Sequence, residues 1–356
     1  ALCPEQVITE YIARLVEFPE ALQVLNFGDG RLVLVGLRAY AGGLLVGSPI
    51  KEMRGHLPPE IDGRIAAIYR RDGAITPTGE TIIEDGDEVF LLAAEEHIRA
   101  VMRELRRSVE PVRRVMIAGG GNIGHRVAQA LEGKCEVKLI EVARRRAEFV
   151  ATSLKAVLVL HGDATDEELL QQEAIDEMDL FLALTNDDED NIMAASLAKK
   201  MGSKRVVALI NRRAYADLVQ GGPIDIAISP AQVSIGTLLT YVRHGDVAQV
   251  HSLRRGAAEA LEVVAHGDQK TSRVVGRRIC DVPTIEGAFI AAVVRDLDKS
   301  QDVGFLGLAK KKQRGRVLIA HKDVVIQTDD HVIVFCLDKK VVMQVEKLFA
   351  VGFHFF

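Results

Sequence analysis

Residues 114–124 read Arg-Val-Met-Ile-Ala-Gly-Gly-Gly-Asn-Ile-Gly, and this stretch decides how the middle of the chain folds. The apolar run before the first glycine predicts a buried strand, and the amphipathic sequence through Leu131 predicts a helix. Gly119, Gly121 and Gly124 lie between them with the spacing G-x-G-x-x-G. Such glycines permit a tight turn, close approach of backbone to a pyrophosphate, and close packing of helix on strand. The stretch predicts a Rossmann-type α/β domain that binds a dinucleotide, with the pyrophosphate at the helix N-terminus.

A carboxylate, Glu141, follows the next predicted strand, Glu136 to Ile140. It stands about 20 residues after the first glycine, where an acid accepts hydrogen bonds from the ribose hydroxyls and repels a 2′-phosphate. The position predicts NAD(H) rather than NADP(H). Arg144 and Arg145 weaken that preference, because an arginine could accommodate the extra phosphate.

Two further strand ends are expected at the same carboxyl edge of the sheet, where open α/β folds bind ligands. The turn after the third strand contains Asp163 and Ala164, whose carboxylate and backbone could hold adenine. The acidic run after the fourth strand begins with Thr185 and Asn186 and precedes a helix predicted over Asn191–Met201. That run either caps the helix or contacts ribose, phosphate or a cation, and both alternatives stay open. The six strands predicted for this doubly wound sheet are 114–118, 136–140, 157–160, 180–184, 206–210 and 224–228.

The chain also contains an internal repeat on either side of this domain. Gln23-Val24 recurs as Gln249-Val250, an offset of 226 residues, whereas Ile83–Val89 resembles Ile326–Val332 at an offset of 243. The larger offset predicts an insertion in the second copy, within Leu297 to Arg316. Each copy combines a helix, short alternating strands and a closing amphipathic helix, which is an α+β pattern.

The repeat predicts a layout with one Rossmann domain between two small domains. The helix that contains Pro230 leads out of the Rossmann domain, so the equivalent helix near Pro4 is expected to have led out of another one, which makes an N-terminal truncation the expectation. Native asymmetry is the alternative. The predicted segments are 1–18, a crossover helix left from a missing first Rossmann domain; 19–108, the first small domain; 109–229, the Rossmann domain; 230–246, a crossover helix; and 247–356, the second small domain.

Composition argues against several classes of protein. A net charge of −5 disfavours binding to nucleic acid, which depends on clustered Lys and Arg. The most hydrophobic stretch, Leu32 to Val46, is shorter than the ~20 residues that span a bilayer and is interrupted by Arg38. The cysteines stand far apart without metal-ligand spacing, so we expect reduced thiols and no metal site in a cytosolic protein; they are Cys3, Cys135, Cys280 and Cys336.

The sequence offers little that could catalyse a reaction. A dehydrogenase needs an acid or base beside the nicotinamide, and the candidates, His125 and His161, are ordinary packed or exposed residues in the favoured interpretation. No common nucleophile, zinc-protease or P-loop motif is present. We therefore expect a protein that is not an enzyme. An NAD-dependent dehydrogenase, with the small domains as substrate or assembly modules, is the alternative.

Several segments together resemble the TrkA family of RCK (KTN) regulatory subunits. They are GGGNIG at 119–124, HGDAT at 161–165, TNDDEDNIMAASLAKKMG at 185–202, VQGGPIDIAISP at 219–230 and SLRRGAAEALEVVAHGD at 252–268. The resemblance implies two tandem units, each an RCK N-terminal Rossmann domain followed by an RCK C-terminal domain, of which the first N-terminal domain is missing here. It further implies a non-catalytic nucleotide-binding regulator, cytoplasmic and peripheral on the inner face of the membrane, which forms a dimer or tetrameric ring beneath a TrkH-like potassium-translocating subunit.

The resemblance also carries over the nucleotide site. The residues implied to bind NAD(H), with ATP or ADP as alternative ligands of the same site, are Gly119, Gly120, Gly121, Asn122, Ile123, Gly124, Glu141, Asp163, Ala164, Thr185 and Asn186. The chain departs from the family pattern in the charged insertion within 297–316 and in the tail 352–356. These departures put any ligand site of the second C-terminal domain in doubt.

Overall fold

The structure of the chain is a computed structural model. It describes residues 3–71, 73–106, 110–219, 222–234, 247–254, 258–297 and 315–351, without the side chains of Asp217 and Lys339. The chain divides into two compact units, Ala1–Leu22 with Glu110–Ile235 and Gln23–Val109 with Gly236–Phe356.

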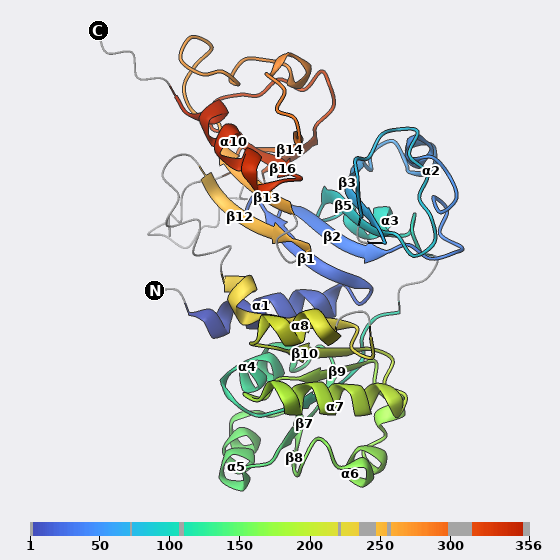
Figure 1. Ribbon diagram of the computed structural model, residues 1–356. Coiled ribbons are helices and arrows are strands. Elements are labelled where there is room, and N and C mark those ends of the chain that lie inside the picture. Colours follow the sequence, from blue (N-terminus) through green and yellow to red (C-terminus); the bar gives the residue numbers. More distant parts are fainter. Residues whose placement is uncertain are drawn as a thin grey trace. The chain divides into compact units, whose positions relative to one another are not determined.

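The first unit contains a six-stranded parallel sheet (Figure 1) with the strand order β11-β10-β9-β6-β7-β8. This order places β6 and β9 at the centre, and the chain builds the sheet outward from β6 through β7 to β8 on one side and from β9 through β10 to β11 on the other, as in doubly wound Rossmann folds. The predicted fold is confirmed, and each predicted strand is found with its ends within two residues. The strands are β6 (Arg114–Ala118), β7 (Glu136–Glu141), β8 (Val157–His161), β9 (Leu180–Ala183), β10 (Val206–Leu209) and β11 (Ile226–Ile228).

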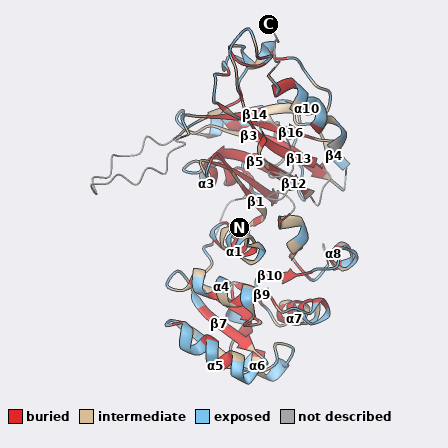
Figure 2. Ribbon diagram, turned by 90° about the vertical axis from the view of Figure 1, so that its left-hand side faces the viewer, coloured by how far each residue is buried: buried red, intermediate tan, exposed pale blue. Residues whose placement is uncertain are grey.

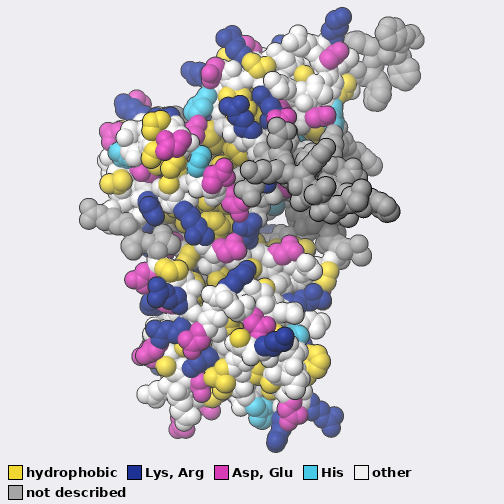
Figure 3. Space-filling view, turned by 180° about the vertical axis from the view of Figure 1, so that it is seen from behind, with side chains coloured by type: hydrophobic (Ala, Val, Ile, Leu, Met, Phe, Trp, Pro, Cys, Tyr) yellow, Lys and Arg dark blue, Asp and Glu magenta, His cyan; other side chains and the backbone are white. Residues whose placement is uncertain are grey.

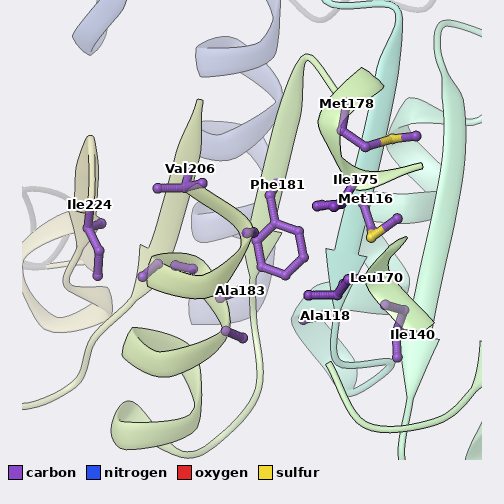
Figure 4. Close-up of a cluster of buried hydrophobic side chains, with 14 of the residues drawn as sticks. Met116, Ala118, Ile140, Leu170, Ile175, Met178, Phe181, Ala183, Val206 and Ile224 are labelled. Atoms are coloured by element: carbon purple, nitrogen blue, oxygen red, sulfur yellow. The ribbon is translucent and has the colours of Figure 1, made fainter. Parts of the chain in front are cut away.

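Helices of this unit bury one face on the sheet and expose the other, as Figure 2 shows for α5 and α6. Figure 4 shows Phe181 of β9 in the middle of one core cluster, with Val206 and Ile224 on one side and Met116 and Ile140 on the other. The helices are α1 (Pro4–Glu17), α4 (Asn122–Leu131), α5 (Arg144–Ser153), α6 (Glu167–Gln172), η2 (Ile175–Glu177), α7 (Asp188–Lys200) and α8 (Arg213–Val219).

Helix α1 packs against α4, the helix that follows the glycine loop. Its buried residues Ile8, Ile12 and Leu15 recur with helical spacing and form one apolar face. Pro4 occupies the start of the helix, where its missing N–H has no intrahelical partner to lose.

Helix α7 begins three residues earlier than the sequence analysis predicted, at Asp188 instead of Asn191. Asp187 is its N-cap, and the Asp187 carboxylate accepts a hydrogen bond from the backbone N–H of Asp190. The prediction was wrong because the acidic run was assigned to a loop, although acids in a first turn are stabilised by the helix dipole.

The second unit contains two five-stranded sheets with equivalent strand orders, β1-β2-β5-β3-β4 and β12-β13-β16-β14-β15. The first sheet is made of β1 (Ala21–Phe27), β2 (Leu32–Arg38), β3 (Gly63–Arg70), β4 (Gly73–Ile75) and β5 (Glu88–Ala94). The second is made of β12 (Val247–Leu253), β13 (Ala258–Val264), β14 (Ala288–Arg295), β15 (Arg316–Ile319) and β16 (His331–Cys336). The helices of the unit are η1 (Ile50–Glu52), α2 (Met53–His56), α3 (Ile98–Met102), η4 (Ile279–Asp281), η5 (Lys339–Val341) and α10 (Val342–Phe349).

The two sheets repeat each other in detail. Strands β1 and β12 both begin and end 226 residues apart, the offset between the matching sequence segments. The pairing of β3 with β5 shifts register between Ile65 and Ala67, and that of β14 with β16 shifts at the equivalent Ile290 and Ala292. Three segments lie outside the described residues: most of the insertion predicted within 297–316 (residues 298–314), most of the second crossover helix (235–246) and the tail (352–356). The predictions about them remain predictions.

One buried ion pair occurs in both copies. The guanidinium of Arg70 donates two hydrogen bonds of 2.8 Å to the carboxylate of Asp87, and Arg295 donates two of 2.9 and 2.8 Å to Asp330. Both aspartates are only 1% exposed. Burial alone would raise the pKa of Asp87, but the bonds from Arg70 and from the N–H of Glu84 lower it overall. Each pair fastens the end of one strand to the turn that precedes its neighbour.

We expect Arg70→Met to lower the free energy of unfolding by roughly 3–5 kcal/mol, because it leaves a buried carboxylate without its cation. Since the folded pKa of Asp87 is lowered, its stabilisation is present above the ordinary carboxyl pKa of about 4 and lost as the pH falls below it. Urea unfolding at several pH values measures both effects. Lys51→Met is the control, since it removes an exposed pair with Glu80 that contributes little to stability. Equal losses in the two variants would contradict the assignment.

Candidate nucleotide site

The three glycines of the fingerprint lie in three different surroundings. Gly119 has φ +100°, and a Cβ there would lie 3.0 Å from the backbone nitrogen of Thr185. A Cβ at Gly124 would lie 1.9 Å from the carbonyl oxygen of Gly119, so only glycine allows α4 to approach β6 this closely. A Cβ at Gly121 would have no atom within 4 Å. These surroundings correspond to the tight turn, the helix packing and the open backbone that a pyrophosphate approaches.

Both backbone polar groups of Gly120 are held by side chains. Glu141, at the end of β7, accepts hydrogen bonds from the N–H of Gly120 at 2.7 Å and of Ala143 at 2.8 Å, one on each carboxylate oxygen. Arg146 donates its Nε–H to the carbonyl of Gly120 at 2.6 Å, and its guanidinium lies 4.9 Å from the ring centre of Phe149. A carboxylate has about four acceptor positions, so Glu141 can accept further hydrogen bonds while it orients the loop.

Arg146 was not among the predicted site residues, whereas its neighbours Arg144 and Arg145 were considered as contacts of a 2′-phosphate. Arg144 and Arg145 are exposed, and Arg144 pairs with Glu148 on the surface of α5. The available signal was helical phase, because Arg146 lies four residues before Val150, which is buried against the sheet.

Asp163 lies at the carboxyl end of β8, on an exposed turn. Its carboxylate accepts hydrogen bonds from the N–H and the hydroxyl of Thr165, at 2.8 and 2.7 Å, which lower its pKa. Ala164 is partly buried against the core of the unit. The next turn along the edge therefore offers an ionised carboxylate that is already oriented by its own loop.

Thr185 follows β9 and is fixed by a residue that the sequence analysis did not identify, Asn191. The N–H and hydroxyl of Thr185 both donate to Oδ1 of Asn191 at 2.8 Å, and the amide of Asn191 donates to the carbonyls of Thr185 and Leu209. Asn191 is fully buried. It thus joins the ends of β9 and β10 beside Gly119, whereas Asn186 is exposed at the rim.

The acidic run after Thr185 is engaged largely by backbone. Asp187 caps α7, so the first of the two alternatives for the acidic run, helix capping, applies to this residue. Asp188 is buried and accepts the N–H groups of Asn211 and Arg212 at 2.8 Å each, which lower its pKa although burial opposes this. Across the described ranges, no group of three or more His, Cys, Asp or Glu side chains is placed to hold a metal ion.

The two candidate histidines have structural partners. His125 meets the hydroxyl of Ser153 at 2.9 Å and the edge of Phe149, and burial, followed by the charge of Arg146, lowers its pKa. His161 is exposed, and its Nε2 lies 3.1 Å from the carbonyl of Val142. Both rings are thus engaged locally, at the α4–α5 contact and at the end of β8.

The similarity of the chain to known proteins extends far beyond the glycine loop and Glu141. The TrkA-N domain matches residues 115–230, and the TrkA-C domain matches residues 34–106. The chain is 52% identical to the Trk system potassium uptake protein TrkA of Halomonas elongata, over 100% of this chain and 74% of that protein. The chain belongs to the TrkA family. The TrkA of Vibrio alginolyticus is 51% identical, over 98% of this chain and 72% of that protein.

Solved structures with the same fold agree with the TrkA assignment. The GsuK RCK domain gives a TM-score of 0.50 at 18% identity and covers 97% of this chain and 70% of that one. The GsuK channel bound to NAD gives the same TM-score and the same identity, and the match covers 95% of this chain and 57% of that one. At this identity the likeness establishes a shared fold. None of the helices in the described part of this TrkA family member is long and apolar enough to cross a membrane.

We expect Gly124→Ala to destabilise the first unit by roughly 1–3 kcal/mol, because its methyl group overlaps the carbonyl of Gly119 and forces the helix away. Gly121→Ser is the control. Its side chain enters open space and serine is a favoured N-cap, so stability should change by no more than about 0.5 kcal/mol. Thermal unfolding of both variants measures the difference, and a stable Gly124→Ala variant would contradict the packing described.

Proposed function

We propose that the chain is the cytoplasmic, nucleotide-binding regulatory subunit of a bacterial Trk potassium uptake system. The observation that carries the proposal is the open backbone at Gly121 beside the oriented carboxylate of Glu141, in a chain of the TrkA family. Both features suit a dinucleotide, and the fold does not require glycine at position 121, since a capping residue such as serine would suit the same backbone position.

The proposed ligand is NAD(H), with ATP or ADP as competitors for the same site. Gly121 is the N-cap of α4, so the first-turn N–H groups, including those of Asn122 and Ile123, are oriented to bind the pyrophosphate. Glu141 would accept the ribose hydroxyls. The remaining proposed contacts lie along the same sheet edge, namely Gly119, Gly120, Gly124, Asp163, Ala164, Thr185 and Asn186.

The proposed regulation follows from linkage. A nucleotide can shift the protein between two states only by its difference in affinity for them. We propose that the chain works in a dimer or tetrameric ring, peripheral on the inner face of the membrane, and acts on a TrkH-like potassium-translocating subunit. The domain layout proposed above, with RCK C-terminal domains at 19–108 and 247–356, supplies the modules for such an assembly.

The proposal includes neither nucleic acid nor catalysis. On the face shown in Figure 3, Lys and Arg side chains are interspersed with Asp and Glu, and the net charge is −5. His125 and His161 are engaged by Ser153 and by a backbone carbonyl. Oxidation of a hydroxy acid or alcohol that depends on NAD and is lost in His161→Ala would favour the dehydrogenase alternative instead.

We expect Glu141→Ala to weaken NAD(H) binding and to lower the ratio of NAD to NADP affinity by about tenfold, which corresponds to about 1.4 kcal/mol. The variant loses the acceptor for the ribose hydroxyls and the charge that repels a 2′-phosphate. Calorimetric titration with both nucleotides measures the ratio. Glu148→Ala, on the exposed surface of α5, should leave it unchanged. An unchanged ratio in Glu141→Ala would show that the acid does not contact the ribose.

We expect Gly121→Val to abolish nucleotide binding while the fold persists, because its side chain occupies the space above the loop where the pyrophosphate lies. In vesicles that carry the membrane subunit and the TrkA family member, this variant should remove the response of potassium flux to NADH. Circular dichroism checks the fold. A flux response that persists without binding would contradict the proposed regulation.

A further inference from the structure

The two sheets of the second unit contact each other through positions that the repeat relates. The side chain of Gln23 donates to the carbonyl of Ser252 at 2.9 Å, and His251 lies 3.1 Å from the carbonyl of Asn26. The guanidinium of Arg64 lies 5.3 Å from the ring centre of Phe289, which is its own equivalent in the second copy. A position that contacts its own equivalent indicates an approximate two-fold relation between the two faces.

The first half of this interface is built around a side chain that only the second copy has. Arg254, in the turn after β12, lies 3.1 Å from the carboxylate of Glu88 and 4.6 Å from the ring centre of Tyr69. Its backbone has φ +43°, a conformation that non-glycine residues rarely adopt. The equivalent residue of the first copy is Gly28, with φ +54°. The second copy thus keeps an arginine at a backbone position that favours glycine, where it reaches an acid and an aromatic ring of the first copy.

In the second half of the interface a glycine, Gly28, takes the place that Arg254 has in the first half, and no side chain fits there. A Cβ at Gly28 would lie 2.9 Å from both methyl carbons of Val294, the equivalent of Tyr69. The N–H of Gly28 donates to Glu262 at 2.9 Å, and the other carboxylate oxygen lies 2.5 Å from Nδ1 of His331. Glu262 is itself absent from the first copy. Its equivalent is Gly36, where a Cβ would lie 2.7 Å from the ring of Phe90.

We propose that these two faces are complementary to each other and that neither is complementary to a second copy of itself. Two first-copy faces would leave Glu88 without a guanidinium and the N–H of Gly28 without a carboxylate. Two second-copy faces would force Arg254 against Val294, where even a methyl group overlaps. Specificity therefore comes from shape and charge that reject the like pair. The first-copy face is paired with the second-copy face in this chain, and a like pair between two chains is rejected at this surface.

Crosslinking with a short bismaleimide tests the pairing in the whole chain. Arg64→Cys with Phe289→Cys should crosslink residue 64 to residue 289, because the two positions face each other. Arg64→Cys alone should give no 64–64 product, and Phe289→Cys alone no 289–289 product, above the background of the parent chain and its native cysteines. Peptide mapping identifies the products. A 64–64 or 289–289 product as abundant as the 64–289 product would overturn the proposal, as would absence of the 64–289 product.

Charge exchange gives a second measurement that does not alter Arg64. Arg254→Glu should lower the melting temperature by roughly 2–8 °C, because it places two carboxylates together. Adding Glu88→Arg should recover at least about half of that shift, since the pair is restored with its charges exchanged. Additive losses in the double variant would overturn the assigned contact.

Discussion

The contact between Gly124 and the carbonyl oxygen of Gly119 determines where the nucleotide helix lies. No Cβ fits there, so α4 starts directly against the end of β6, at the carboxyl edge of the sheet. Glu141 and Arg146 then hold the N–H and the carbonyl of Gly120, and Asn191 fixes Thr185 on the neighbouring strand. The loop is therefore ordered by its own protein before any ligand arrives, which lowers the entropic cost of binding.

The second unit shows how a duplicated fold keeps its framework while its contact faces diverge. The buried pairs Arg70–Asp87 and Arg295–Asp330 are the same interaction in both sheets, because a buried carboxylate requires its cation. Positions at the contact between the sheets are free of that constraint, and there glycine in the first copy is replaced in the second, Gly28 by Arg254 and Gly36 by Glu262. The proposed consequence of this divergence is that unlike faces pair and like faces do not.

Sequence patterns were sufficient wherever the structure depends on local order. The strand before Gly119, the acid at the end of β7 and the offsets of the repeat are short-range or periodic signals, and they predicted the doubly wound sheet and the repeated small domains, whereas the nucleotide site stays a prediction. Arg146 and Asn191 escaped prediction because their roles depend on which way a helix face turns: Arg146 reaches Gly120, and Asn191 joins Thr185 to Leu209. The contact of Arg254 with Glu88 likewise joins residues far apart in the chain, and no spacing rule indicates it.

The proposed regulation requires that the loop held by Glu141 and Arg146 bind a nucleotide. Calorimetric titration of NADH into the parent chain, Arg146→Met and Arg144→Met measures this. We expect the parent to bind NADH, Arg146→Met to bind it at least about tenfold more weakly, as expected for loss of one charged hydrogen bond, and Arg144→Met to bind it within about twofold of the parent. Equal affinities for all three proteins, or no heat of binding with NADH, NAD, ATP or ADP in the parent, would contradict the proposal.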